Sequence, residues 1–230
     1  MKPVDRPSPN WDSRGEVPID MLVLHYTGMP SGEAALARMC DPAEKVSAHY
    51  MIDEDGAVYA LVPEEMRAWH AGISYWAGAR DINARSIGIE LVNPGHEFGY
   101  RAFPEAQIAA LTELANAILA RHPIPAWRVL GHSDVAPMRK DDPGELFPWA
   151  SFAGQGIGLW PTKGDDPGEA KVAALLARFG YDPEAPLEKT VTAFQRHFRA
   201  LRVDGMADAE TRALLAGLIA LYDAQKGDAR

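Results

Sequence analysis

Three short, continuous apolar runs constrain the fold of this chain more than any other feature. They are "MLVLHY" (21–26), "SIGIELV" (86–92) and "WRVLGH" (127–132). Runs of this length without polar alternation are typical of strands that are buried on both faces of a sheet. They therefore predict an interior sheet, and the segments between them must supply the layers that cover it.

The intervening segments predict those layers and one further pair of strands. "SGEAALARMC" (31–40) begins with a serine cap and continues with helical spacing, and 103–122 has Pro104 in its first turn and an amphipathic pattern. In "AHYMIDEDGAVYALV", Asp55-Gly56 separates two alternating runs and predicts a hairpin. Strands mixed with helices predict an α/β fold in which helices flank one central mixed sheet.

The composition changes after Trp149, and this change predicts a second domain. Residues 150–168 are rich in glycine and interrupted by proline, which indicates a connector. Beyond it the apolar spacing is helical in three segments, 170–179, 187–201 and 209–222. We therefore divide the chain into residues 1–162, with an N-terminal arm and the connector, and a small three-helix domain over 163–230.

Charge and cysteine content exclude several functions for this 230-residue chain. Its formal net charge is -9, and it has no basic stripe of the kind that nucleic acids require. Cys40 is the only cysteine, so an internal disulfide and a cysteine-based zinc cluster are excluded. No stretch resembles a signal peptide or a membrane span. We expect a cytoplasmic monomer, or a periplasmic or envelope protein if an export signal has been trimmed.

Candidate metal ligands lie at the ends of two predicted strands. His25 and His132 hold these positions, and two imidazoles with one carboxylate form the ligand set of a catalytic zinc. Asp134, Asp141 and Asp142 are all candidates for the carboxylate. His132-Ser133-Asp134 also fits half of a non-haem iron site, whose distal histidine could then only be His197. Seven histidines can, however, form such pairs by chance.

Glu90 and Lys140 are candidates for the chemistry itself. A carboxylate in the apolar strand 86–92 is costly to bury unless it is paired or used. Glu90 is therefore either a partner of Arg85 or Arg128 in a salt bridge, or a general base with a raised pKa. Lys140 is either solvated or placed to stabilise an oxyanion beside a metal.

Several ordered motifs resemble one enzyme family. "LVLHYTG", "VSAHYMID", "AWHAGISYW", "SIGIELVNPG" and "GHSDVAPMRKDDPGELFPW" are similar to the zinc-dependent N-acetylmuramoyl-L-alanine amidases of the AmpD/AmiD type. These amidases share their fold with the peptidoglycan recognition proteins. The resemblance spans about residues 18–161, and "QGIGLWP" is closest to the AmiD branch. The tail resembles a three-helix peptidoglycan-binding domain through "AFQ" and "VDG", although Met206-Ala207-Asp208 replaces the usual glycine.

The resemblance implies a role for each candidate residue. It selects Asp142 as the carboxylate that binds one zinc with His25 and His132. It makes Asp134 a residue that orders the loop or supports the metal ligands, with its side chain bonding a nearby backbone or histidine N–H. Glu90 becomes the general base and Lys140 the oxyanion partner. Substrate contacts are implied for the following residues: Tyr26, Trp69, His70, Arg80 and Asn93. His49 is expected to be a buried, hydrogen-bonded histidine.

The resemblance implies hydrolysis of the amide between the lactyl group of N-acetylmuramic acid and L-alanine in bacterial cell-wall turnover. The alternative is a module that recognises peptidoglycan without cleaving it. The C-terminal domain would raise the local enzyme concentration on glycan. Both soluble muropeptides, anhydro or reducing, and intact peptidoglycan are possible substrates.

Overall fold

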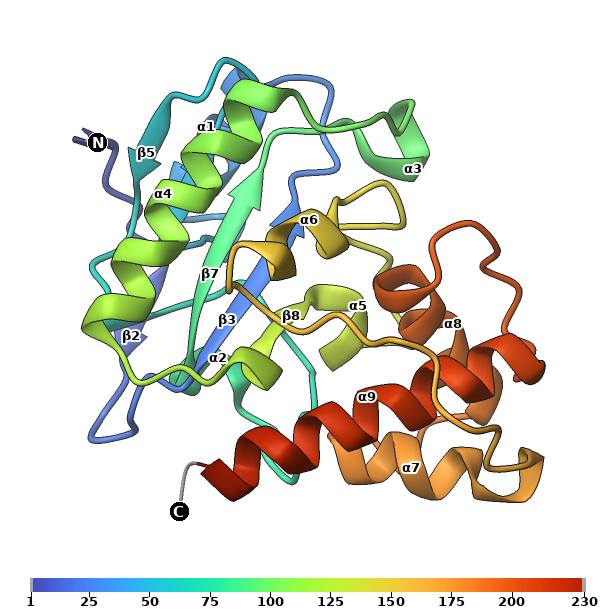
Figure 1. The fold of residues 1–230 in the computed structure, drawn as a ribbon. Helices are drawn as coiled ribbons and strands as arrows, with labels where there is room; N and C mark the ends of the chain where they lie inside the picture. The colour runs from blue at the N-terminus through green and yellow to red at the C-terminus, as the bar shows by residue number, and fades with distance from the viewer. Residues whose placement is uncertain (1, 229–230) are drawn as a thin grey trace.

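The computed structural model describes residues 2–228 and is built around a six-stranded mixed sheet (Figure 1). The strand order is β1-β5-β4-β7-β3-β8. Its members are β1 (Val4–Asp5), β3 (Met21–Tyr26), β4 (Tyr50–Ile52), β5 (Val58–Ala60), β7 (Ser86–Leu91) and β8 (Val129–Gly131). Strands β4, β7, β3 and β8 are parallel to one another, whereas β4 and β5 form the predicted antiparallel hairpin. The mixed sheet is therefore confirmed.

The N-terminal arm adds strands that the sequence did not predict. β1 pairs in parallel with β5 at the sheet edge, and β2 (Trp11–Ser13) forms a separate antiparallel pair with β6 (Met66–Ala68). These strands have two or three residues each, which is too short for an apolar period to be recognised.

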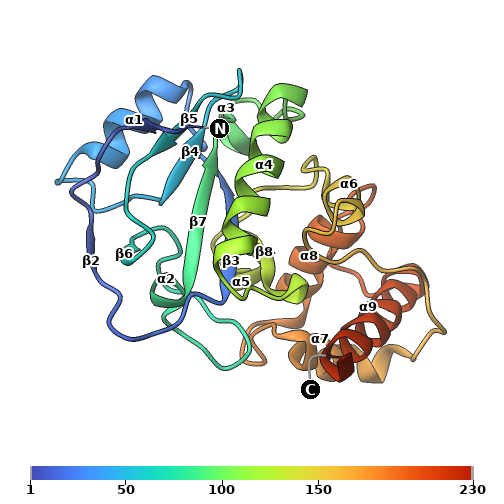
Figure 2. The same ribbon diagram turned by 60° about the vertical axis from the view of Figure 1, so that its left-hand side comes forward.

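Two helices cover opposite faces of the sheet, as Figure 2 shows. They are α1 (Gly32–Cys40) and α4 (Glu105–Arg121). The Ser31 side chain caps α1 by accepting a hydrogen bond from the Ala34 backbone N–H, as its position predicts. The shorter helical segments of this part of the chain are α2 (Ile82–Arg85), α3 (Gly95–Phe98), η1 (Ala126–Arg128), α5 (His132–Val135) and α6 (Trp149–Gly154).

Alternation along β3 determines which side chains face each layer. Leu22 and Leu24 pack with the α4 side of the core, whereas Met21 and Val23 belong to a different buried cluster on the other face. Successive side chains of a strand point to opposite faces. His25 therefore lies on the face away from α4, at the carboxyl end of the strand.

The C-terminal part is helical and packs beside the β8 edge of the sheet (Figures 1 and 2). It consists of η2 (Glu169–Lys171), α7 (Val172–Phe179), α8 (Leu187–Phe198) and α9 (Ala209–Asp228). The three helical segments predicted from the sequence are present, although α8 ends three residues earlier and α9 continues six residues further than expected. We call residues 2–162 the α/β region and residues 163–228 the helical region.

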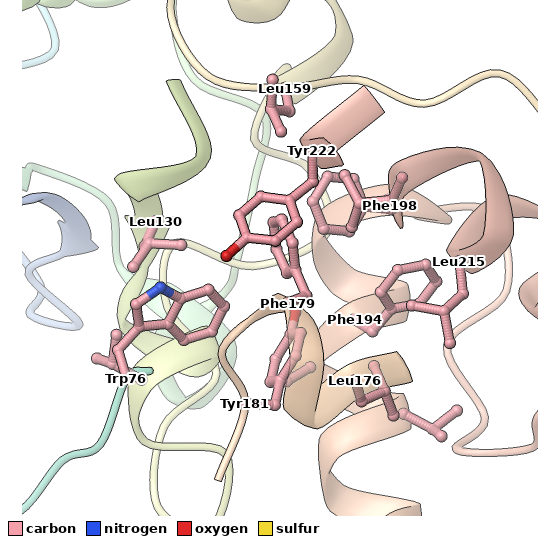
Figure 3. Close-up of a cluster of buried hydrophobic side chains, with 14 of the residues drawn as sticks. Trp76, Leu130, Leu159, Leu176, Phe179, Tyr181, Phe194, Phe198, Leu215 and Tyr222 are labelled. Carbon is pink, nitrogen blue, oxygen red and sulfur yellow. The ribbon is translucent and has the colours of Figure 1, made fainter. Parts of the chain in front are cut away.

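The two regions share one hydrophobic cluster, which Figure 3 shows in close-up. Trp76 and Leu130 come from the α/β region and pack against aromatic side chains of the helical region, among them Phe179 and Tyr181. The Trp76 ring also lies close to the backbone of Gly180, where a Cβ atom would come within 2.5 Å of the ring. The domain boundary at residue 162 remains a prediction. In the structure, the two regions are joined by buried apolar contacts.

Candidate metal centre and active site

The structure brings His25, His132 and Asp142 together at the carboxyl ends of β3 and β8. Because Leu24 pairs with Gly131, the two histidines occupy adjacent positions just beyond that pair. Their Nδ1 atoms are 2.9 Å apart, and each lies 3.0 Å from Oδ2 of Asp142. In residues 2–228 this is the only cluster of histidine, cysteine and acidic side chains whose geometry could hold a metal ion. Of the three candidate carboxylates, the structure thus places Asp142 with the histidines.

A chain of hydrogen bonds fixes the tautomer of His25. The Ser86 hydroxyl donates to the Ile82 carbonyl, so its oxygen is free to accept from Nε2–H of His70. Nδ1 of His70 then accepts from Nε2–H of His25 at 3.0 Å. Nδ1 of His25 is left without a proton and with its lone pair directed at Asp142. Such a partner on the distal nitrogen is typical of a metal-binding histidine.

His132 is oriented in the same sense by the backbone. Its Nε2 lies 3.1 Å from the Ala71 carbonyl oxygen, which can only accept a hydrogen bond. Nε2 therefore carries the proton, and Nδ1 presents a lone pair. The segments that carry the ligands are also joined directly, because the Ser133 backbone N–H donates to the Asp142 carbonyl.

Two bare nitrogens and a carboxylate oxygen consequently face one another inside the protein. Burial is the main cause that lowers the pKa of His25 to about 4, so its imidazole is neutral near pH 7. Three electron-pair donors without a proton between them suit a cation, and two imidazoles with a carboxylate are a catalytic zinc set.

Gly88 makes room for the outer histidine of this chain. It lies in β7 beneath the His70 ring, and a Cβ atom there would come within 2.5 Å of the ring. His70 was predicted as a substrate contact. Its place in the structure is behind His25, although its ring also reaches the wall of the cavity beside the metal centre.

Glu90 lies beside His25 on the neighbouring strand, because the two residues are register partners in β7 and β3. Its Oε2 atom is buried and has no hydrogen-bond partner. Burial chiefly raises the pKa of Glu90 well above its ordinary value, the charge of Asp142 adds to this effect, and Lys140 opposes it. The predicted salt-bridge alternative is wrong, because Arg85 and Arg128 both bind Asp20 instead.

A cavity of about 270 Å³ opens beside these groups. The residues that line it include Glu90, Lys140, His132, Asp142 and Tyr26. The Tyr26 hydroxyl contacts Nδ1 of His96, whose Nε2 lies 3.2 Å from the Glu145 carboxylate. His96 could not be selected from the sequence, since a single histidine in a four-residue helix has no periodic signal.

Three other predicted substrate residues lie outside the lining of this cavity. The Asn93 side chain is fully buried and binds its own loop, through the Arg101 carbonyl and the Gly95 N–H. Arg80 forms an ion pair with Glu184 of the helical region. Trp69 is half-buried, and its indole N–H has no hydrogen-bond partner. Contact of these three residues with substrate therefore stays a prediction, and their positions in the structure do not add support to it.

Asp134 is held in a separate buried group. Its Oδ2 accepts hydrogen bonds from the Gly131 backbone N–H and from Nδ1–H of His197, and Oδ1 accepts from the Tyr181 hydroxyl. The loop-ordering role expected for Asp134 is thus confirmed. His197 does meet Asp134, as the iron alternative required, but through a direct hydrogen bond that leaves no space for an ion. His49 is buried and hydrogen-bonded, as expected.

Comparison with known proteins now identifies the family. The sequence model of the N-acetylmuramoyl-L-alanine amidase family matches residues 15–145, which is more than half of the chain. The chain belongs to this family. Its resemblance to the amidases, its mixed-sheet fold and its nature as an enzyme are therefore confirmed.

Individual amidases match over most of their length. The chain is 41% identical to N-acetylmuramoyl-L-alanine amidase AmiD of Escherichia coli K12, over 89% of this chain and 83% of that protein. It is 38% identical to 1,6-anhydro-N-acetylmuramyl-L-alanine amidase AmpD of Citrobacter freundii, over 64% of this chain and 86% of that protein. The structure of E. coli AmiD with anhydro-N-acetylmuramic acid-L-Ala-D-gamma-Glu-L-Lys superposes with a TM-score of 0.81. That match has 39% identity and covers 92% of this chain and 93% of the other.

Proposed function

We propose that this amidase uses one zinc ion, held by His25, His132 and Asp142, to hydrolyse the amide between N-acetylmuramic acid and L-alanine. The observation that carries the zinc assignment is the convergence of two unprotonated Nδ1 atoms on a carboxylate oxygen. A bound zinc ion supplies Lewis-acid polarisation of the scissile carbonyl and lowers the pKa of water. The protein's own residues must then place the water, move its proton and stabilise the charge that develops.

Glu90 is the proposed general base. Glu90 lies beside His25 on the neighbouring strand and lines the cavity, and its Oε2 atom has no hydrogen-bond partner. A raised pKa brings a carboxyl group closer to neutral pH, where it can accept a proton from water and later return it to the leaving amine. Glu90 thus performs both proton transfers.

Lys140 is the proposed oxyanion partner. It lines the same cavity, two residues before Asp142, so the loop that supplies a metal ligand also supplies a cation. Attack on the amide places negative charge on the carbonyl oxygen, and an ammonium group beside that oxygen stabilises this charge more than it stabilises the substrate. Loss of one such donor typically costs about a hundredfold or more in turnover.

Anhydromuramyl peptides are the proposed substrate class. E. coli AmiD has been solved with such a peptide, and AmpDh3 of Pseudomonas aeruginosa with an anhydromuramic pentapeptide. The latter match has a TM-score of 0.82 at 33% identity, and it covers 94% of this chain and 95% of that one. Reducing muropeptides and intact peptidoglycan are the alternative substrates, and the rates of stem-peptide release from the three forms rank them.

The substrate preference would indicate the cellular compartment in which the enzyme acts. No helix of residues 2–228 combines the length and apolarity needed to cross a bilayer. Preference for soluble anhydro-muropeptides favours recycling in the cytoplasm, and preference for the polymer favours action in the periplasm or envelope. The helical region is proposed to bind peptidoglycan, and a sedimentation assay with insoluble peptidoglycan tests this separately.

The deciding experiment incubates purified protein with anhydro-muropeptides, reducing muropeptides and peptidoglycan, and identifies the products by mass spectrometry. Free stem peptide should appear, disappear with a chelator and return when Zn²⁺ is added back. Glu90→Gln protein that contains zinc is the matched control and should release none. Protein with one zinc per chain and no release from any substrate would instead establish a recognition module.

A further inference from the structure

The loop that carries the metal ligands is held from outside by the helical region. Residues 131–145, which we call the metal loop, contact α8 and the turn before it at several points. Nδ1 of His197 lies 2.7 Å from Oδ2 of Asp134, and the Tyr181 hydroxyl lies 2.6 Å from Oδ1 of the same carboxylate. Arg196 of α8 forms an ion pair at 2.7 Å with Asp141, the residue before the ligand Asp142.

Asp134 connects these contacts to the metal ligand. Its Oδ2 also accepts the backbone N–H of Gly131 at 2.7 Å, and Gly131 immediately precedes His132. This bond closes the first turn of α5, because the side chain of the third helical residue binds the N–H at the helix start. The orientation of the Leu130–Gly131 peptide, which leads into His132, therefore depends on where the Asp134 carboxylate is held, and the direction of the His132 ring depends on it in turn.

Both bonds to Asp134 that come from outside the metal loop originate in the helical region. Asp134 and Tyr181 are each 1% exposed, and His197 is 3% exposed, so water does not compete for these bonds. The His197 ring is stacked between Trp149 and Phe198, with ring centroids 3.7 Å and 3.9 Å away. Tyr181 is wedged against Trp76 at 5.0 Å (Figure 3). This packing restricts the movement of both donors.

We propose that Tyr181 and His197 are positioning residues for the metal centre: through Asp134 they fix the turn that presents His132 to the zinc ion. The helical region then has a second role besides any contact with glycan, because it completes the support of the site. This inference rests on the proposed zinc site. Partners of this kind, one step removed from the ligands, typically change metal affinity or activity by about 10–100-fold.

The test compares Tyr181→Phe with Tyr222→Phe. Both variants remove one hydroxyl from an aromatic ring of the same shared cluster, but only the Tyr181 hydroxyl binds Asp134. Zn²⁺ affinity and the rate of Zn²⁺ transfer to a chromogenic chelator are measured with full-length protein, well below the thermal transition. Tyr181→Phe should lose affinity about tenfold and release Zn²⁺ faster, whereas Tyr222→Phe should match the wild type.

A second pair of variants separates the hydrogen bond of His197 from its stacking. His197→Phe keeps an aromatic ring between Trp149 and Phe198 but removes the donor, whereas His197→Asn keeps a side-chain N–H near the position of Nδ1. His197→Phe should release Zn²⁺ faster than His197→Asn. This pair also keeps the proposal testable if Tyr181→Phe does not fold.

The outcomes distinguish this inference from the function on which it rests. Wild-type protein that binds no Zn²⁺ would defeat the proposed function itself. Wild-type Zn²⁺ affinity and release in Tyr181→Phe and His197→Phe, with both variants folded, would overturn only the positioning role. Equal losses in Tyr181→Phe and Tyr222→Phe would also overturn it, because the effect would then come from general loosening of the shared cluster.

Discussion

Two aspartates of the metal loop, Asp134 and Asp142, are alike in burial and opposite in their surroundings. They are 1% and 5% exposed and only eight positions apart in the chain. Three hydrogen-bond donors converge on the Asp134 carboxylate, whereas Oδ2 of Asp142 faces two nitrogens that carry no proton. A buried carboxylate surrounded by hydrogen-bond donors therefore supports the fold, whereas one that faces unprotonated nitrogens is suited to bind a cation. Burial and sequence spacing do not distinguish the two cases.

The largest expected effect of this difference is on metal content. Asp142→Asn replaces an anionic ligand oxygen with a neutral amide and should leave less than about a tenth of the zinc bound at micromolar protein. Asp134→Asn should retain most of its zinc under the same conditions. Elemental analysis after desalting measures both, and the reverse order of zinc contents would exchange the roles assigned to the two residues.

Glu90 is a third buried carboxylate that differs from both aspartates. Its buried Oε2 atom accepts no hydrogen bond and faces no metal-ligating nitrogen. Glu90→Gln should keep its zinc but lose about 10²–10⁴-fold in turnover, because the amide cannot take a proton from water. Steady-state release of stem peptide and zinc content are measured on the same sample. A Glu90→Gln enzyme with wild-type turnover would remove Glu90 from the mechanism.

The stability of the metal-free protein should change in different directions at the two aspartates. Asp134→Asn presents an amide to groups that are themselves donors, and it should lower the free energy of unfolding by about 1–3 kcal/mol. Metal-free Asp142→Asn should be at least as stable as metal-free wild type, because the substitution removes a charge that faces bare nitrogens. Urea denaturation in the presence of a chelator measures both variants.

Glu64 provides the smallest effect and lies away from the cavity. Burial would raise its pKa, but hydrogen bonds from Arg121, His122 and Tyr50 outweigh this and lower the pKa to about 2. A depressed pKa stabilises the fold above the unfolded-state value of about 4.3, and this contribution is lost as the pH falls toward 2. Glu64→Gln should therefore be less stable than wild type at pH 7, and the gap should narrow below pH 4.5 in thermal melts. A gap that is constant with pH would contradict this assignment.

Patterns that are local in sequence were sufficient for much of the fold. Apolar runs located β3, β7 and β8, Asp55-Gly56 located the hairpin, and Ser31 marked the start of α1. Each of these signals acts over a few neighbouring residues. For the same reason, the ends of two strands were enough to select His25 and His132 as candidate ligands.

The remaining features depend on contacts between distant segments. Spacing alone could not choose among Asp134, Asp141 and Asp142, since all three follow His132 in one loop. Resemblance to the family made that choice, and the geometry agrees with it. Nothing local to Tyr181 or His197 indicates Asp134, which lies 47 and 63 positions earlier. The space that Gly88 leaves for His70 is likewise visible only when the strands are assembled.

The hydrogen bonds of Asp134 also have a consequence for the order in which the protein matures. A ribosome has delivered every proposed zinc ligand once residue 142 is made, but the Tyr181 and His197 donors are synthesised later. At about 5–20 residues per second, the nascent α/β region spends several seconds without these two donors to Asp134. Under the proposed positioning role, the metal centre can therefore gain this support only after residue 197 has been made, so the helical region sets the moment at which the site is complete.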